Sequence, residues 1–204
     1  PKLKFFNDDM NSNIIIKDLM SHRTGLPRHD FSWYLFPSYN ADSLLQRIQH
    51  QEPFTGIREQ WYYNNFMFFT QGVIAENITE KSWGENIKER FFEPLEMSRS
   101  NVSIDELMKS SNAAFGYTIK GDTIHKLDYY KIAGMRAAGS INSSVNEMSN
   151  WLITWINKGV FNEKEIIPAA YVNEAISSQM VINAGLPNKE NPNMHLSNYG
   201  YAWM

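Results

Sequence analysis

The stretch from about Asn65 to Ile78 limits the possible folds more than any other part of the sequence. Its apolar residues recur at the spacing of one helical face: Phe66, Phe69, Val73 and Ile74. This spacing predicts an α-helix. Met67 and Phe68 widen the apolar stripe, so we expect the helix to be buried on several sides. We therefore interpret it as the central helix of the fold.

The length and composition are sufficient for a packed core around such a helix. The chain has 204 residues, of which 43% are apolar, with six Trp, twelve Phe and ten Tyr. A chain of this size and composition can bury enough apolar surface to fold. We expect one largely helical domain over residues 1–204.

Other helices are predicted by capping signals and by apolar spacing. A Ser followed three residues later by a Glu is the capping-box pattern, and it occurs at Ser82 with Glu85, Ser103 with Glu106 and Ser144 with Glu147. Further helices are expected near Ile15 to Ser21, from Ser43 to Ile48, from Val145 to Lys158 and from Pro168.

Only one sheet is predicted. Gly121-Asp122 separates the runs Gly116–Lys120 and Thr123–Leu127, which is a two-residue hairpin signal. The stretch from Asn183 to Asn193 is rich in turn-forming residues and indicates a surface loop. The predicted fold class is therefore mainly α (α+β), with one small antiparallel hairpin.

The charge and the cysteine content exclude several kinds of partner. The net charge is −3, and Lys and Arg are scattered, so no basic surface for nucleic acid is indicated. No apolar run approaches the roughly 18 to 20 residues that span a bilayer. The chain has no Cys and so no disulfide, thiol nucleophile or thiolate metal site. We expect a small-molecule or peptide substrate and no cofactor.

Three separated motifs point to one enzyme family. A Tyr-x-Asn pattern lies directly before the central helix, within Gln60–Phe68. Read with Ile16–Pro27 upstream and Phe92–Met97 downstream, this segment resembles the beta-lactamase-related serine hydrolases, which include class C beta-lactamases, D-Ala-D-Ala peptidases and related esterases. The resemblance runs through nearly the whole chain and implies the helical region of a beta-lactamase/transpeptidase-like fold.

The Tyr-x-Asn pattern alone does not choose its residues. It is met by Tyr62 and Asn64, by Tyr63 and Asn65, and by Tyr171 and Asn173. The family pattern has one aromatic residue two positions before the Tyr and another three positions after the Asn. Trp61 and Phe68 fit that register and select Tyr63 and Asn65 as the candidate catalytic residues.

The resemblance also implies what these residues do. The phenol of Tyr63 would share protons with the nucleophile and the leaving group, and the amide of Asn65 would hold the acyl-side amide of the substrate. A free tyrosine has a pKa near 10, so a phenolate at neutral pH needs a shift of roughly 3 units, or about 4 kcal/mol, from nearby cations. The family supplies these with Ser-x-x-Lys and with Lys-Thr-Gly or His-x-Gly, and none of these patterns occurs in the chain.

Two histidines raise a metal hypothesis: His22, within the loop Ser21–Pro27 (the motif loop), and His29, just after it. For His22 we expect a buried, hydrogen-bonded imidazole rather than a catalytic one. His29 and Asp30 could join it around a metal ion, but they lie in a loop with no further ligand nearby. Zinc sites need three or four protein ligands, so we expect no metal.

The functional expectation is a hydrolase region that is inactive as given. We expect a fragment lacking the N-terminal Ser-x-x-Lys and the C-terminal His-x-Gly or Lys-Thr-Gly parts, whose partner is the rest of its own polypeptide. The sequence Ser-His-Arg-Thr-Gly-Leu-Pro at residues 21–27 favours the peptidase and esterase-like branch of the family, which acts through an acyl-enzyme. The family suggests a bacterial periplasmic or secreted location.

Two alternatives remain open from the residues. The first is a stand-alone helical domain that binds a ligand or peptide in the pocket of Tyr63. The second is a structural fragment with an aromatic core and no ligand.

Overall fold

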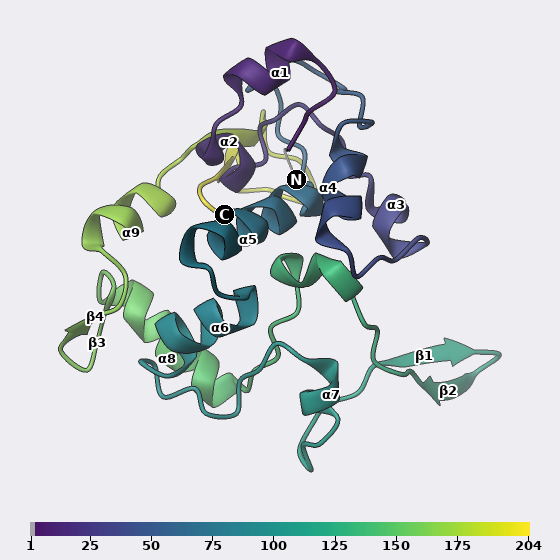
Figure 1. Ribbon diagram of the computed structural model, residues 1–204. Coiled ribbons are helices and arrows are strands. Elements are labelled where there is room, and N and C mark those ends of the chain that lie inside the picture. Colours follow the sequence, from purple (N-terminus) through teal and green to yellow (C-terminus); the bar gives the residue numbers. More distant parts are fainter. Residues whose placement is uncertain (1–2) are drawn as a thin grey trace.

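The computed structural model describes residues 3–204, and the helix α5 (Asn65–Thr79) lies in the middle of it (Figure 1). The remaining α-helices are α1 (Asp8–Asn13), α2 (Ile16–Met20), α3 (Asp30–Tyr34), α4 (Ala41–Ile48), α6 (Trp83–Ile87), α7 (Ile104–Leu107), α8 (Val145–Ile156) and α9 (Ala169–Ala175). A π-helical turn covers Lys88–Phe92 and a 3-10 segment covers Ala133–Ala138. Pro1 and Lys2, at the start of the predicted domain, lie outside the described residues.

The central position predicted for α5 is confirmed by its neighbours. It packs against α2, α4, α6 and the 3-10 segment. The main core cluster forms where these elements meet, and its fully buried members include Leu26, Leu44, Ile48, Phe66 and Met67. Gly72 allows the close approach of the 3-10 segment, because a Cβ there would lie 2.3 Å from the Cβ of Ala137.

A second, smaller core cluster lies under α8. It is formed by Phe92, Leu95, Met97 and Phe161. Trp151 from α8 packs against it, with its ring edge-on to that of Phe91. This cluster fixes α8 beside the π-helical turn.

The helix starts predicted from Ser-x-x-Glu are confirmed. α6, α7 and α8 each begin directly after the Ser, whose hydroxyl accepts a hydrogen bond from the backbone N–H of the Glu. Both halves of the capping box form at Ser82. At the start of α8 the carboxylate of Glu147 instead accepts from the backbone N–H of Arg99 and from the hydroxyl of Ser100, at 2.7 and 2.6 Å.

The prediction of a mainly α fold with a single hairpin is wrong. Residues 3–204 contain three antiparallel sheets of two strands each, and the chain is 38% helix and 11% strand, a mixed α/β composition. The predicted hairpin is present as β1 (Tyr117–Lys120) and β2 (Thr123–Lys126), which projects from the body in Figure 1. The unpredicted sheets pair β3 (Val160–Phe161) with β4 (Lys164–Glu165) and β5 (Met180–Ala184) with β6 (Leu196–Tyr199).

Each missed sheet has a physical reason. The turn between β3 and β4 places Asn162 and Glu163 at φ 47° and 62°. Two positive φ angles in a row are typical of a type I′ hairpin turn. The second position is Glu163 instead of the usual Gly, so the sequence does not show the Asn-Gly pattern by which such turns are recognised. β5 begins before the turn-rich stretch and includes its first residues, Asn183 and Ala184. Its partner β6 lies beyond the loop, so local composition did not reveal the pairing.

No helix in residues 3–204 is both long enough and apolar enough to cross a membrane.

Candidate active site

The candidate site lies where the chain enters α5. Asn64 occupies the N-cap position of that helix and is fully buried. Its side-chain oxygen accepts from the N–H of Phe66 at 2.8 Å, and its amide nitrogen donates to the carbonyl of Pro27 at 2.7 Å and to Gln51 Oε1 at 3.2 Å. All of its polar atoms are thus used in joining α5 to the preceding loop, which makes Asn64 a structural residue.

Asn65 is the first residue of α5 and is half-buried. Its amide nitrogen donates to Asp30 Oδ1 at 3.0 Å. The Asp30 carboxylate also accepts from Arg28 Nε at 2.7 Å and from Trp33 Nε1 at 3.3 Å. An ionised carboxylate only accepts hydrogen bonds, so the amide nitrogen of Asn65 faces Asp30 and its amide oxygen faces away.

Tyr63 lies between these two asparagines and the motif loop. Its ring packs against that of His22 at 4.3 Å between centroids, and the Arg28 guanidinium carbon lies 5.0 Å from its centroid. Burial raises the pKa of the Tyr63 phenol, the Arg28 charge opposes this, and the Asp30 charge adds to it. With the charges of residues 3–204 alone, the Tyr63 phenol is therefore protonated at neutral pH.

His22 is the buried histidine that the sequence predicts. Its side chain is completely buried and its Nδ1 accepts from the backbone N–H of Asn64 at 3.3 Å. Its carbonyl oxygen accepts from the N–H of Tyr62 at 3.0 Å. Burial, together with the Arg28 charge, lowers the pKa of His22 to about 4, so the imidazole is neutral at neutral pH.

The loop that carries His22 is held by a buried carboxylate that the sequence reasoning missed. Asp18 is completely buried and accepts from Arg23 Nε at 2.7 Å, from Arg58 Nε and Nη2 at 2.9 and 2.7 Å, and from the N–H of Ile15 at 3.0 Å. The backbone N–H of Arg58 also donates to the backbone carbonyl of Arg23 at 2.8 Å. The pattern Asp-x-x-x-x-Arg within Asp18–Arg23 could have suggested the first of these pairs.

Gly25 allows this loop to turn. Its φ is 85°, in the left-handed region that glycine adopts readily, and a Cβ there would lie 2.3 Å from the carbonyl oxygen of Thr55. The Gly25 carbonyl accepts from the N–H of Phe54 at 2.8 Å. The loop that contains Gly25 is thereby joined to the loop that contains Phe54 and Thr55, which precedes the segment that carries Tyr63.

The metal hypothesis gains no ligand set. Among residues 3–204, no group of three or more His, Asp or Glu side chains is placed to hold an ion. Asp30 instead binds Arg28 and Asn65, as described above.

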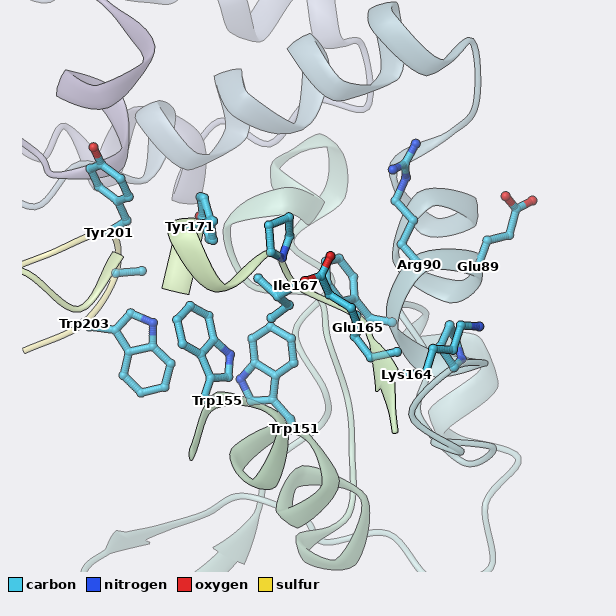
Figure 2. A pocket seen from close by; sticks show the side chains of 15 residues that line it. Glu89, Arg90, Trp151, Trp155, Lys164, Glu165, Ile167, Tyr171, Tyr201 and Trp203 are labelled. Carbon is cyan, nitrogen blue, oxygen red and sulfur yellow. The ribbon is translucent and has the colours of Figure 1, made fainter. Parts of the chain in front are cut away.

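An aromatic groove lies apart from the candidate site. Its volume is about 760 Å³, and it is lined by α8, α9, the β3–β4 hairpin and the segment after β6. Figure 2 shows Trp203, Trp155 and Trp151 in a row, with Lys164 and Arg90 toward one end. Tyr63 and Asn65 are not among the lining residues.

The comparisons with known proteins indicate the same family as the sequence motifs. A model of the family described as Beta-lactamase matches residues 3–204. "Unguisins hydrolase ungD'" of Aspergillus campestris is 24% identical over 201 residues, which cover 94% of this chain and 35% of that protein. "Protein flp" of Staphylococcus aureus is 26% identical over 125 residues, covering 60% of this chain and 25% of that protein. The chain thus spans about a third or less of these curated relatives.

Solved structures show the same fold at low identity. The octameric penicillin-binding protein homologue from Pyrococcus abyssi has a TM-score of 0.73 and 20% identity, over 98% of this chain and 47% of that one. The D-stereospecific amidohydrolase from Streptomyces sp. has a TM-score of 0.70 and 18% identity, over 98% of this chain and 58% of that one. These are mixed α/β proteins, in line with the sheets described above. Since the family model covers nearly the whole chain, the chain belongs to the beta-lactamase family.

Proposed function

We propose that this chain is the part of a serine hydrolase that contributes Tyr63 and Asn65 to an acyl-enzyme site acting on amide bonds of peptide-like substrates. The nucleophilic Ser and the general-base Lys come, on this proposal, from another part of a longer polypeptide, and the chain alone is inactive. The observation that carries the proposal is the start of α5. There the buried side chain of Asn64 makes all its hydrogen bonds within the protein as the helix cap. Asp30 meanwhile orients the half-buried Asn65 beside Tyr63.

The electrostatics of Tyr63 support this division of roles. Burial raises the pKa of its phenol, and its nearby cation, Arg28, is ion-paired with Asp30. Proton transfer is efficient when the pKa of the group lies near the working pH. Additional positive charge is needed to bring the phenol into that range, and a Ser-x-x-Lys lysine is the group that the family resemblance implies.

The names of the relatives support an amide substrate. Two structural neighbours are called a D-stereospecific amidohydrolase and a D-amino acid amidase, the latter from Ochrobactrum anthropi. An ester substrate uses the same acyl-enzyme chemistry, so peptidase and esterase activities are compared in the test below.

The aromatic groove supports a partner region in the same polypeptide. Trp151, Trp155 and Trp203 are only partly buried, so the groove keeps apolar surface open to solvent that a second region could cover. We propose that the region carrying the nucleophile packs here. Acrylamide quenching of Trp fluorescence should fall when this region is present, because the indoles are then shielded.

The test compares this chain with the longer polypeptide that contains it. Each is incubated with a fluorescent penicillin or a fluorophosphonate, and covalent labelling is measured, followed by turnover of matched amide and ester substrates. Labelling of the longer form alone is expected. Tyr63→Phe should slow labelling of that form by about 100-fold or more, the usual range for loss of an acid-base group.

Tyr62→Phe is the matched control. Its hydroxyl donates to Gln60 Oε1 at an exposed site, so labelling should be unchanged. Equal labelling by wild type and Tyr63→Phe would refute the catalytic assignment.

A second candidate function is favoured by the same groove. A groove of this size is in the range of ligand-binding pockets, which supports binding of a ligand or peptide there, although Tyr63, where the sequence placed such a site, is not among the lining residues. Short peptides would then quench Trp fluorescence of this chain, and Trp203→Ala would remove the effect. If neither peptide binding nor labelling of the longer form is detected, both functions fail.

A further inference from the structure

His22 contacts the candidate catalytic residue Tyr63 and both of its neighbours in the chain. Its carbonyl oxygen accepts from the N–H of Tyr62, and its Nδ1 accepts from the N–H of Asn64. These two bonds fix the backbone immediately before and immediately after Tyr63. The His22 ring also lies 4.3 Å from the Tyr63 ring, so one residue contacts both the main chain and the side chain of this segment.

We propose that His22 is the positioning residue of Tyr63, acting as a neutral imidazole that carries its proton on Nε2. This inference rests on the proposed function, because it gives His22 a part in placing the Tyr63 hydroxyl. His22 acts through Tyr63 and is not itself assigned contact with substrate.

The hydrogen bonds define the tautomer. The backbone N–H of Asn64 can only donate, so His22 Nδ1 must be the unprotonated, accepting nitrogen. The proton of the neutral ring is then on Nε2, which has no hydrogen-bond partner among residues 3–204. A buried N–H without a partner is unfavourable, so this side chain is not explained by stability alone.

The surroundings of His22 keep the ring neutral and fixed. Phe68 lies 4.5 Å away and nearly perpendicular, and Tyr199 lies 5.4 Å away, both measured between ring centroids. Among residues 3–204, the charged groups that act on His22 and Tyr63 are Arg28 and Asp30, which are ion-paired with each other. Burial lowers the pKa of His22, in agreement with a ring that does not charge at neutral pH.

The backbone also restricts which residues fit here. His22 has φ 53°, in the left-handed region. Among residues with a side chain, Asn, Asp and His adopt this region most readily. Asn additionally places an oxygen where His places Nδ1, so His22→Asn keeps the acceptor for Asn64 and loses the ring. His22→Phe keeps a ring and loses the acceptor.

The first experiment needs no substitution. In this chain, labelled with ¹⁵N in histidine, long-range proton-nitrogen NMR correlations at pH 7 identify the tautomer of each imidazole. The expected result is a neutral His22 with its proton on Nε2. A proton on Nδ1, or a charged ring, overturns the proposal.

The second experiment measures hydrogen exchange of the Asn64 amide in the same chain. Exchange should be faster by about 5- to 150-fold in His22→Phe, the range expected when a buried N–H loses its acceptor. It should remain near the wild-type rate in His22→Asn. His29→Phe is the control for backbone strain, because His29 has φ 49° and no bond to Asn64. Unchanged exchange in His22→Phe overturns the proposal.

The third experiment uses the longer, active polypeptide and separates this inference from the proposed function. His22→Phe should lower kcat by about 10- to 100-fold with little change in KM, as expected for misplacement of a catalytic group, and His22→Asn should recover part of it. If Tyr63→Phe lowers kcat and His22→Phe does not, the positioning role is wrong and the function stands. If neither lowers kcat, the assignment of Tyr63 fails, and the positioning role fails with it.

Discussion

Replacing Asp18 by Asn should destabilise the protein by about 3 kcal/mol at neutral pH. The Asp18 carboxylate is completely buried and accepts four hydrogen bonds, three of them from Arg23 and Arg58. Asn has nearly the same shape, but it lacks the charge and presents donors to two guanidinium groups. Breaking a buried ion pair from one side costs roughly 3 to 5 kcal/mol. The lower end applies here, because the side chains of Arg23 and Arg58 are 16% and 44% exposed and regain some water.

The measurement is thermal and urea unfolding of this chain. For a domain of this size, 1 kcal/mol corresponds to roughly 2 to 4 °C in Tm, so a fall of about 6 to 12 °C is expected. Asp105→Asn is the control, because the partners of the Lys131–Asp105 pair are 49% and 65% exposed. Such a surface pair contributes about 0 to 1 kcal/mol, so its loss should lower Tm by no more than a few degrees.

The pH dependence tests the cause of the effect. Burial acts to raise the pKa of the Asp18 carboxyl, but the hydrogen bonds from Arg58, Ile15 and Arg23 and the Arg23 charge together outweigh it and lower the pKa in the folded state. A lowered folded pKa contributes stability above the unfolded pKa of about 3.9, and this contribution is lost as the pH falls through the folded pKa. The difference between wild type and Asp18→Asn should therefore be full at pH 7 and shrink below pH 4. A difference under about 1 kcal/mol at pH 7, or one that does not change on acidification, would refute the reasoning.

Three further predictions concern the site and the core. Asn64→Ala should cost about 2 to 4 kcal/mol in urea unfolding, since it removes a helix cap and unpairs buried groups, whereas Asn65→Ala should cost about 1 kcal/mol or less and slow labelling of the longer polypeptide. Equal costs for the two would contradict their assigned roles. Gly72→Ala should cost about 1 to 3 kcal/mol, because its Cβ would overlap that of Ala137, and a neutral result would contradict the packing described. Burial raises the pKa of Tyr199 to about 12, so its contribution to stability is complete below pH 10 and is lost as the pH rises toward 12; Tyr199→Phe should remove that loss in alkaline unfolding, and an unchanged alkaline midpoint would count against it.

Local signals in the sequence predicted the helices that have a capping box or a clear apolar spacing, but not α1 or α3. The central helix was predicted from its apolar spacing, and it is found at Asn65–Thr79. The helix starts at Ser82, Ser103 and Ser144 are confirmed because an N-cap hydroxyl acts within its own turn. Sheets failed for the opposite reason. The pairing of β5 with β6 depends on residues separated by a loop, which local composition does not show.

The candidate site could be predicted only in part for the same reason. Tyr63 and Asn65 were chosen from sequence, but the residue that orients Asn65 is Asp30, on another element. From the sequence alone, Asp30 is only a candidate metal ligand. The contact between Tyr63 and His22 likewise joins positions far apart in the chain. A motif names the residues that the chemistry needs, and tertiary contacts decide which neighbours orient them.

On the proposed function, the charges around Tyr63 call for a cation from outside this chain. Burial and the Asp30 carboxylate both keep the phenol protonated, and among residues 3–204 Arg28 alone acts in the other direction. Arg28 is paired with Asp30, and its side chain is 58% exposed, so its effect on Tyr63 is weakened by solvent. Asp30 is at the same time the group that orients Asn65, so removing it to favour the phenolate would release the amide. Removing Asp30 would therefore lower the pKa of the phenol only at the cost of the Asn65 geometry, and it would add no positive charge. On the proposed function, that charge has to come from a lysine brought in by a second region, which makes activity depend on the two regions being assembled.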